Sequence, residues 1–329
     1  MTDGASGSRT LALTGATGFV GSHVLNAALD AGWRVRALAR DPSRLPDHPL
    51  LEPLRGSLED DDALARLVTG ADTVLHVAGL VAAAREADFH RINAEAAGRL
   101  AETAARAGIR RFVHVSSLAA REPHLSPYAA SKRASEAAVT GAAGARMSVA
   151  VLRPPAVYGP GDRATLGLFD QLTRPVTLLP GRRDMRVSLI HVRDLASALL
   201  HLAASEDIDG EVLEMDDGTP QGYTWEDMAR IAGDVLRRPV RMVLLPRTLV
   251  RLAGFGADLV STLTGRAFML SAAKARELYH PDWVARPPTL AERTDWTPRI
   301  RFAEGFRETL HWYCERGWLP RERLPENRT

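Results

Sequence analysis

Three glycines, Gly15, Gly18 and Gly21, limit the folds open to this chain more than any other feature. They stand between a short apolar run, Thr10–Thr14, which predicts a strand, and the helical pattern Ser22–Ala31. In such a unit the first glycine permits a tight turn, the second lets a pyrophosphate approach the backbone, and the third lets helix and strand pack closely. The loop amides and the helix N-terminus then favour an anion. The chain is therefore predicted to begin with a dinucleotide-binding unit.

Strand-length apolar runs alternate with helical patterns through the first half of the chain. The run at 72–79, DTVLHVAG, is almost continuously apolar, as is typical of a strand buried on both faces. This alternation predicts an α/β fold with a doubly wound parallel sheet of the Rossmann type and a smaller C-terminal α/β lobe. The expected strands are Val35–Ala39, Leu54–Ser57, Asp72–Gly79, Phe112–Ser116 and Val149–Leu152, and the expected helices are Glu86–Ala107 and Pro127–Thr140.

The character of the chain changes after Arg153, where residues 154–162 form a loop rich in Pro and Gly. We expect residues 10–153 to form the dinucleotide-binding domain and residues 154–329 to form mainly the substrate lobe and a closing helix. Residues 1–9 are polar and predict a disordered tail. Three later segments within about 187–216 are expected to return to the first domain: the strand Val187–His191, the helix Val192–Ala204 and the strand Val212–Met215.

A tyrosine and a lysine four positions apart, Tyr128 and Lys132, predict a catalytic pair on one face of a helix. Ser126 suits the cap and Pro127 the first position of that helix. A cation beside a phenol is expected to lower the pKa of the tyrosine from about 10 and allow proton exchange near neutral pH. Among 42 basic residues only two are lysine, so a lysine at this spacing is not expected from composition. Ser117 follows a predicted strand and is expected to bind a substrate oxygen.

Arg40 ends the second predicted strand, where cofactors without a 2′-phosphate usually meet an acidic residue. Arg36 and Arg44 lie near it in sequence. Arginine suits a phosphate, so the pattern favours NADP(H) over NAD(H), although a solvated arginine is the competing interpretation. The segment that ends in Gly79 is expected to pass beside the cofactor; His76 within it is interpreted as structural.

Composition excludes several classes of function. The net charge is +2, from 42 basic and 40 acidic residues, which gives no electrostatic case for nucleic acid. The single cysteine, Cys314, excludes an internal disulfide and fits a reducing compartment. The N-terminus lacks the apolar core of a signal peptide, and no apolar run is long enough to span a bilayer. We therefore expect a cytoplasmic protein with no metal site, present as a monomer or a homodimer.

The most apolar part of the second half is the segment 243–265, in which Leu245, Leu249, Leu252, Leu259 and Leu263 fall near one face of a predicted helix. One interpretation is a core or dimer-facing helix. The other is a lid for a lipid-like substrate, with peripheral membrane contact.

Taken together, these motifs resemble the extended short-chain dehydrogenase/reductase family, also described as epimerase/dehydratase-like, over about residues 10–318. The branch that reduces steroid, flavonoid or ceramide-type ketones is the most similar. The matching segments are TGATGFVG at 14–21, HVAG at 76–79, RINAEAAG around Asn93, FVHVSS at 112–117, SPYAASK at 126–132, LRPPAVYGPGD at 152–162 and VSLIHVRDLA at 187–196.

The resemblance implies a role for each matching residue. Tyr128 would be the general acid/base, Lys132 would bind the nicotinamide ribose, and Ser117 would polarise the substrate carbonyl, with Asn93 completing the catalytic group. Further cofactor contacts are implied for Gly15, Thr17, Gly18, Phe19, Val20, Gly21, Arg40, Ser57, Leu58, Val77, Ala78, Gly79, Pro154 and Val157, and substrate contacts for Ser117, Leu118, Tyr158 and Arg186.

Two departures from the family pattern matter. Ser57 replaces the aspartate that often follows Gly56, which puts the adenine contact there in doubt. Ser117 and Tyr128 are only eleven positions apart, whereas sugar-nucleotide members usually carry an insertion between them.

Three functions remain open at this level. The first is an NAD(P)H-dependent oxidoreductase acting on a hydrophobic ketone or secondary alcohol, most specifically a 3-oxo-ceramide or a related sphingolipid or sterol-like ketone. The second is a sugar-nucleotide epimerase or dehydratase in which Arg182, Arg183 and Arg186 grip a diphosphate. Leu118 and Ala119 stand where a dehydratase usually has acidic residues, which argues against dehydration. The third is a non-catalytic NAD(P)-binding protein, although such relatives often lack the Tyr–Lys pair.

Overall fold

A computed structural model describes residues 9–205, 207–246, 248 and 276–325. Its centre is a seven-stranded sheet in the order β11-β6-β5-β4-β1-β2-β3, with every neighbouring pair parallel. The predicted doubly wound α/β fold is confirmed. The strands are β1 Thr10–Thr14, β2 Arg34–Ala39, β3 Leu51–Arg55, β4 Thr73–His76, β5 Arg111–Val115, β6 Ser148–Arg153 and β11 Glu211–Glu214.

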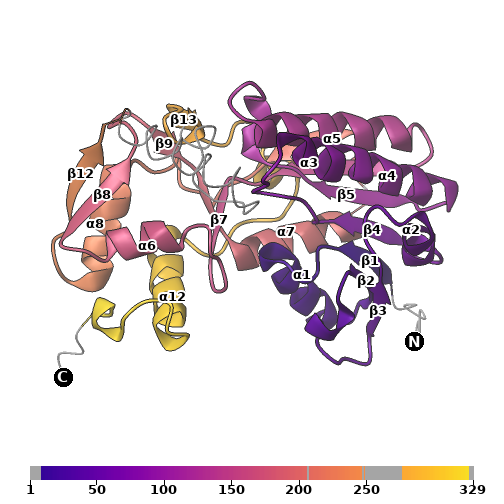
Figure 1. Ribbon diagram of the computed structural model, residues 1–329, viewed down its shortest axis with the longest axis horizontal. Helices are drawn as coiled ribbons and strands as arrows, with labels where there is room; N and C mark the ends of the chain where they lie inside the picture. The colour runs from indigo at the N-terminus through magenta and orange to yellow at the C-terminus, as the bar shows by residue number, and fades with distance from the viewer. Residues whose placement is uncertain (1–8, 206, 247, 249–275, 326–329) are drawn as a thin grey trace.

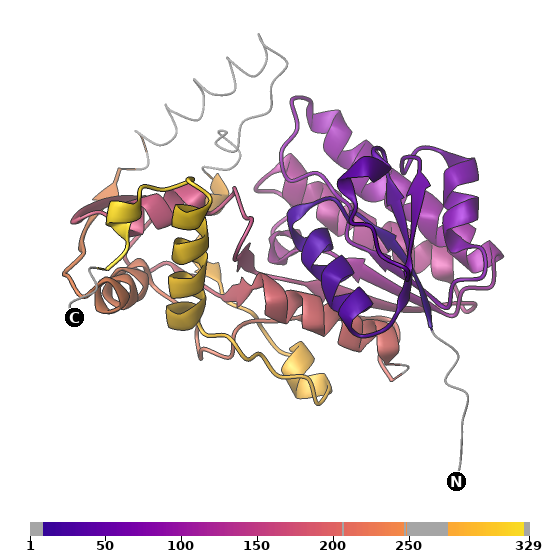
Figure 2. The ribbon, with the colours of Figure 1, turned by 90° about the horizontal axis from the view of Figure 1, so that it is seen from below.

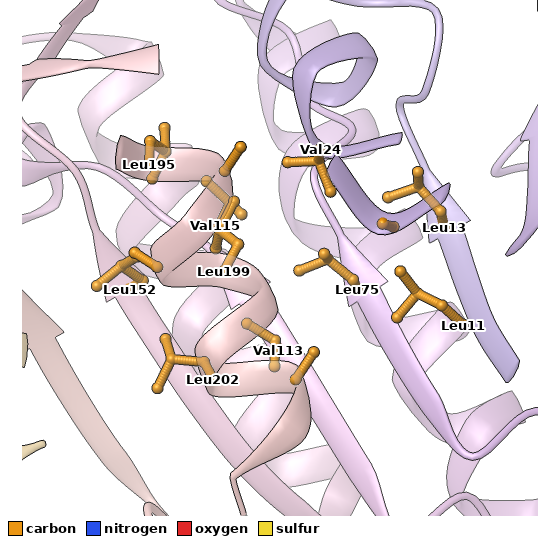
Figure 3. Packing of buried hydrophobic residues seen from close by; sticks show 14 of the residues in the cluster. Leu11, Leu13, Val24, Leu75, Val113, Val115, Leu152, Leu195, Leu199 and Leu202 are labelled. Carbon is orange, nitrogen blue, oxygen red and sulfur yellow. The ribbon is translucent and has the colours of Figure 1, made fainter. Parts of the chain in front are cut away.

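Helices cover both faces of this sheet (Figure 1). Apolar residues of α1 and α7 form one core against the sheet, and those of α2, α4 and α5 form a second core on the opposite face. Figure 3 shows Leu195, Leu199 and Leu202 of α7 beside Val113 and Leu152 of the sheet. The helices are α1 Phe19–Asp30, α2 Asp61–Val68, α3 Glu86–Phe89, α4 Ala96–Arg106, α5 Pro127–Ala143 and α7 Val192–Ala204, with short helical segments η1 Pro42–Arg44, η2 His90–Glu95 and η3 Leu118–Arg121.

A second lobe packs beside the sheet and is built around aromatic residues (Figures 1 and 2). Phe169 stacks on Phe306, and Tyr158 packs edge-on against Phe302. Three two-stranded parallel sheets complete it: β8 Val176–Pro180 with β12 Arg241–Leu245, β7 Ala156–Tyr158 with β10 Leu189–His191, and β9 Arg186–Val187 with β13 Asp282–Trp283. Its helical segments are α6 Leu166–Leu172, α8 Trp225–Leu236, α12 Phe302–Glu315 and η4 Arg321–Arg323. The short helix α11 Leu290–Arg293 instead packs through Leu290 into the core formed by α1, α7 and the large sheet.

Several expected boundaries differ from the observed ones. The first helix begins at Phe19 rather than Ser22, because Gly18 already serves as its N-cap. The expected helix Glu86–Ala107 contains the π-helical turn η2, the loop after Arg153 contains the short strand β7, and the expected strand Val187–His191 belongs to two sheets.

The predicted apolar helix at 243–265 begins instead with strand residues, because Val243, Leu244 and Leu245 pair with β8. Residues 247 and 249–265 of that prediction lie outside the described part, as do residues 1–8 of the expected tail. Within the described residues, no helix combines the length and the apolar character that crossing a membrane requires.

The turn between β1 and α1 depends on its glycines. Gly15 has φ of 80°, in the left-handed region, and an added Cβ there would lie 2.7 Å from the backbone nitrogen of Ala78. A Cβ on Gly21 would lie 1.9 Å from the carbonyl oxygen of Gly15. The first turn of α1 therefore packs directly against the loop that starts it, and any side chain at position 21 must push the two apart.

Gly21→Ala should lower the free energy of unfolding by about 3 kcal/mol and weaken cofactor binding, because the overpacked loop must shift. Gly141→Ala is the matched control: this helical glycine in α5 has nothing within 4 Å of an added Cβ, so alanine should be neutral or stabilising there. Urea denaturation of both variants tests this. Equal stability of the two variants would contradict it.

Candidate active site

The predicted catalytic residues meet at the carboxyl-terminal edge of the parallel sheet. Gly79 follows β4, Ser117 follows β5, and Tyr128 and Lys132 lie on α5, which packs against that edge. A Cβ added to Gly79 would lie 3.7 Å from Nζ of Lys132 and 3.2 Å from Oδ1 of Asn93. The topology thus brings together four segments that are separate in sequence, at the edge where parallel sheets bind ligands.

Helix α5 starts as predicted and so fixes the direction of Tyr128. The Ser126 hydroxyl accepts a hydrogen bond from the backbone N–H of Ala129 at 3.0 Å, and Pro127 occupies the first turn. Phe89 packs edge-on against the tyrosine ring, with 6.1 Å between the ring centroids. The Ser117 side chain lies close enough to the tyrosine hydroxyl to lower its pKa. Serine and tyrosine hydroxyls therefore face the same small region.

Lys132 follows Tyr128 by one turn of α5 and is buried, with 5% of its surface exposed. Its ammonium donates a hydrogen bond of 2.6 Å to the carbonyl oxygen of Val115. Burial lowers the pKa of Lys132 to about 8, while the charge of Glu136 opposes this effect. His76 and His114 stack on each other within the same region, and burial together with the lysine charge lowers both of their pKa values, that of His76 to about 3. Both imidazoles are therefore neutral, as the structural interpretation of His76 requires.

The pKa of Tyr128 moves opposite to our expectation. Burial raises it to about 12, the Ser117 side chain opposes the rise, and the carboxylate of Glu277 adds to it. The prediction of an acidified phenol was wrong for the protein alone, because spacing along a helix gives proximity but says nothing about desolvation. At neutral pH the tyrosine is a protonated hydroxyl, ready to donate.

Asn93 holds the loop after β4 in place. Its Oδ1 accepts a hydrogen bond from the N–H of Leu80 at 2.7 Å, and its Nδ2 donates to the carbonyl of Leu80 and to the hydroxyl of Ser131. The residue lies in the π-helical turn η2, a rare geometry that often marks functional sites. Its bonds tie the Gly79 loop to α5, one residue before Lys132.

The glycine loop fits a pyrophosphate. The N-cap of α1 has no side-chain hydrogen bond and the first turn has no acidic residue, so its amides and dipole face no competing carboxylate there. Thr17, Phe19 and Val20 are only partly buried, and Gly18 is exposed. Val77 and Ala78 are also partly buried, and they lie close enough to Gly15 to exclude a side chain there.

The arginines expected near the adenosine phosphate do not all lie together. Arg40 is exposed at the end of β2, and Arg44 donates a 3.5 Å hydrogen bond to the carbonyl of Thr17 in the glycine loop. Arg36 instead points to the neighbouring strand, where it pairs with Glu52 at 2.8 Å, so it is not part of this group. Arg55, which we did not predict, donates to the carbonyl of Arg40 at 3.4 Å. Our placement of the third strand three residues too late hid its terminal position.

The remaining predicted cofactor residues lie along the same edge. The Ser57 hydroxyl accepts a hydrogen bond from the N–H of Glu59 at 3.2 Å, and Leu58 packs against the core under α2. The carbonyl of Pro154 accepts a hydrogen bond from the N–H of Leu118 at 3.0 Å. Val157 packs against the core between the sheet and α7. Their contacts with a cofactor remain predictions.

Two of the predicted substrate residues are buried. Tyr158 is 1% exposed and sits in the aromatic core of the second lobe, with its ring against His191, Phe169 and Phe302. Its position beside a Pro/Gly-rich loop suggested exposure, but β7 turns it inward. Leu118 is also buried, so its side chain is not an open contact surface. Arg186 is partly exposed and donates to the carbonyl of Gln221 at 3.3 Å.

Sequence reasoning also missed Glu277, a buried carboxylate near the tyrosine. The hydroxyl of Ser126 donates a hydrogen bond to it, and its charge raises the pKa of Tyr128. No local signal could have revealed this, because the two segments are 151 residues apart.

Comparison with known proteins agrees with this geometry. The family model described as "NAD dependent epimerase/dehydratase family" matches residues 11–215. The chain belongs to this family. Its likeness to the extended short-chain dehydrogenase/reductases is therefore confirmed, and the protein is an NAD(P)-dependent enzyme with a nicotinamide cofactor.

Individual relatives match this chain over two thirds of its length or more. This chain is 42% identical over 316 residues to "Ceramide reductase" of Caulobacter vibrioides, and the match covers 94% of this chain and 96% of that protein. It is 31% identical over 271 residues to "3 beta-hydroxysteroid dehydrogenase/Delta 5-->4-isomerase" of Mycobacterium tuberculosis (strain H37Rv), covering 68% and 72%. A solved structure, "MoeE5 in complex with UDP-glucuronic acid and NAD", aligns with a TM-score of 0.72 at 25% identity and covers 95% of this chain and 100% of that one.

Lys132→Met should make the protein more stable at neutral pH. Lowering the lysine pKa from 10.5 to about 8 on folding corresponds to a cost of about 3 kcal/mol below pH 8. Between pH 8 and 10.5 the unfolded chain binds more protons, so this cost falls as pH rises.

Urea denaturation of both proteins at pH 7 and pH 10 measures this cost. The advantage of the methionine variant should be larger at pH 7. Loss of the bond to the Val115 carbonyl reduces that advantage equally at both pH values. A difference that stays constant or grows with pH would contradict the sign of the lysine pKa.

Proposed function

We propose that the protein reduces a ketone on a hydrophobic, lipid-like substrate with NADPH. One observation carries the proposal: a protonated Tyr128 stands close enough to Ser117 for the serine side chain to lower its pKa, and the buried ammonium of Lys132 belongs to the next turn of the same helix. A ketone oxygen placed between the two hydroxyls receives a hydrogen bond from each. As that oxygen becomes an alkoxide it is a stronger base than a phenolate, so the proton passes from tyrosine to product.

In such a reduction, Ser117, Tyr128 and Lys132 would each have a separate role. NADPH, when bound, supplies the hydride to the carbonyl carbon. Ser117 polarises the carbonyl and fixes its oxygen, and Tyr128 donates the proton. The positive charge of Lys132 stabilises the phenolate left behind, so the lysine acts after proton transfer rather than by acidifying the resting tyrosine.

The substrate class rests on the relatives and on the short segment between serine and tyrosine. The protein named ceramide reductase matches 94% of this chain at 42% identity. The hydroxysteroid dehydrogenase matches 68% of this chain at 31% identity. Both names describe large apolar substrates. Ser117 and Tyr128 are eleven positions apart, so the chain lacks the insertion that sugar-nucleotide members usually carry between these two residues. A 3-oxo-ceramide or a similar long-chain ketone is accordingly the most specific substrate that we propose.

A sugar-nucleotide epimerase or dehydratase is the alternative, favoured only by the likeness in fold to proteins such as MoeE5. Its expected diphosphate grip is weakened by the ion pairs that the arginines form. Arg182 pairs with Asp184 at 2.6 Å, and Arg183 pairs with Glu226 at 2.9 Å, both on the surface.

NADPH oxidation should occur with a long-chain 3-oxo-ceramide and should fall about a hundredfold or more in Tyr128→Phe, with cofactor affinity retained. Tyr158→Phe is the matched control: its hydroxyl has no hydrogen-bond partner among the described residues, so activity should persist. Stopped-flow absorbance at 340 nm measures the turnover. Background rates across a panel of keto-lipids, combined with thermal stabilisation by UDP- or TDP-sugars, would replace this proposal with the alternative.

Arg40→Ala should weaken NADPH binding about tenfold and leave NADH binding unchanged, because one charge-assisted contact with the 2′-phosphate is lost. Arg36→Ala removes an arginine from the same strand that is engaged with Glu52, and it should not change the ratio of the two affinities. Fluorescence titration with each cofactor gives both ratios. A preference for NADH in the unmodified protein would overturn the assignment.

A further inference from the structure

A series of buried ion pairs, called the ion chain below, contacts the segments before and after Ser117. Four side chains of alternating sign form it in the order Glu136, Arg153, Glu214 and Arg121, and all four are buried or nearly so. They come from helix α5, the end of β6, the end of β11 and the end of η3. Isolated charges at such depth would cost several kcal/mol each, so their pairing is a strong structural constraint.

The first half of the ion chain, Glu136 and Arg153, is hydrogen-bonded to Ser116, the residue before Ser117. Arg153 donates two hydrogen bonds of 2.7 Å to the two carboxylate oxygens of Glu136. The Ser116 hydroxyl donates a third hydrogen bond to the same carboxylate at 2.5 Å. Glu136 lies one helical turn after Lys132, so this carboxylate joins the backbone at Ser117 to the turn of α5 that carries the lysine.

The second half holds the segment after Ser117. Arg153 lies 3.7 Å from Glu214, which pairs with Arg121 at 3.0 Å. Arg121 also donates to the carbonyls of Asp282 and Val284 in the second lobe, at 3.0 and 2.7 Å. The backbone N–H of Arg286 donates to Glu214 at 2.7 Å. The two halves meet at Arg153, so both flanks of Ser117 are fixed by one connected set of charges that also contacts the second lobe.

We propose that Ser116 and the ion chain Glu136–Arg153–Glu214–Arg121 are positioning residues that hold Ser117 and Lys132 in register. This proposal deepens the proposed ketone reduction and rests on it for its kinetic part. None of these residues touches substrate in our scheme. They act by setting where the serine hydroxyl and the lysine ammonium stand, and a displacement of about 1 Å costs about a hundredfold in rate.

The surroundings of Lys132 give a readout that does not depend on turnover. The carboxylate of Glu136 raises the lysine pKa against the effect of burial. The other groups that face the ammonium are the Val115 carbonyl and the neutral rings of His76 and His114, beneath the Asn93–Gly79 loop. Arg133 also lies 3.5 Å from Glu136, at the protein surface. Removing the Glu136 charge should therefore lower the pKa of Lys132 below about 8.

The sequence makes this pKa measurable, because Lys132 and Lys274 are the only two lysines. Lysine-selective ¹³C labelling in a Lys274→Arg background leaves a single signal to titrate by NMR. Glu136→Gln should shift that titration to lower pH, and the alkaline loss of turnover should shift with it. Glu304→Gln, an exposed glutamate on α12, is the matched control and should leave both unchanged.

Ser116→Ala tests the positioning of Ser117 with a smaller change. Turnover should fall about tenfold with cofactor affinity unchanged, because the serine loop loses its tie to Glu136. The control is Ser148→Ala, which removes a hydroxyl bonded to Arg111 at 2.7 Å at the opposite end of β6. Normal turnover in Ser116→Ala would overturn the positioning role of Ser116.

A matched pair of changes separates positioning from simple stability. Glu136→Met with Arg153→Met removes one whole ion pair and should preserve folding, whereas Glu136→Gln alone leaves Arg153 without this carboxylate. We expect this double variant to keep the unmodified protein's melting temperature and still turn over at least tenfold more slowly. Recovery of both stability and turnover would overturn the proposal, as would an unchanged Lys132 titration in Glu136→Gln. Absence of ketone reduction by the unmodified protein would reject the proposed function and leave the titration to decide this one.

Discussion

The site depends on one buried ammonium and on how its charge is compensated. Lys132 is removed from water at the edge of the sheet, where a free ammonium would cost several kcal/mol. The carbonyl of Val115, at the end of β5, accepts a hydrogen bond from the ammonium, with 2.6 Å between nitrogen and oxygen, and Glu136 supplies the opposite charge one turn along the helix. The neighbouring imidazoles of His76 and His114 respond by staying neutral. Burial is the main cause of that neutrality, and the charge of Lys132 adds to it.

The parallel topology explains why such a site is possible. Adjacent strands end at the same edge, so the residues that follow β4 and β5 become neighbours although about forty positions separate them. Helix α5 crosses the same edge and adds the tyrosine and the lysine. The return of β11 beside β6 then brings Glu214 next to Arg153 and links this edge to the second lobe.

Sequence patterns predicted what local spacing controls. The glycine loop, the cap at Ser126 and the shared face of Tyr128 and Lys132 follow from short-range geometry, and the structure contains each of them. Quantities set by long-range packing were not predictable in this way. Burial raised the pKa of the tyrosine, and Glu277 reached it from a distant segment.

The errors at the arginines have the same origin. Arg36 and Arg40 are four residues apart in sequence, yet only Arg40 stands at the strand end, where Arg55 reaches its carbonyl. Which arginine stands at the carboxyl end of the sheet therefore depends on where β2 ends and on which residues β3 places beside it, and a one-dimensional pattern does not contain that pairing. Tyr158 was misplaced because a loop rich in proline and glycine contains a three-residue strand that turns the ring into an aromatic core.

A resting tyrosine with a raised pKa changes how the division of work should be understood. A phenolate prepared in advance would suit the removal of a proton from an alcohol, whereas a protonated phenol suits donation to a growing alkoxide. The equilibrium of the reaction is unaffected, since it is set by the reactants and not by the enzyme. The desolvated site controls the protonation state in which Tyr128 stands when the substrate binds. In the reduction that we propose, Lys132 has its largest effect when negative charge reaches Tyr128, so it stabilises the transition state more than the resting protein.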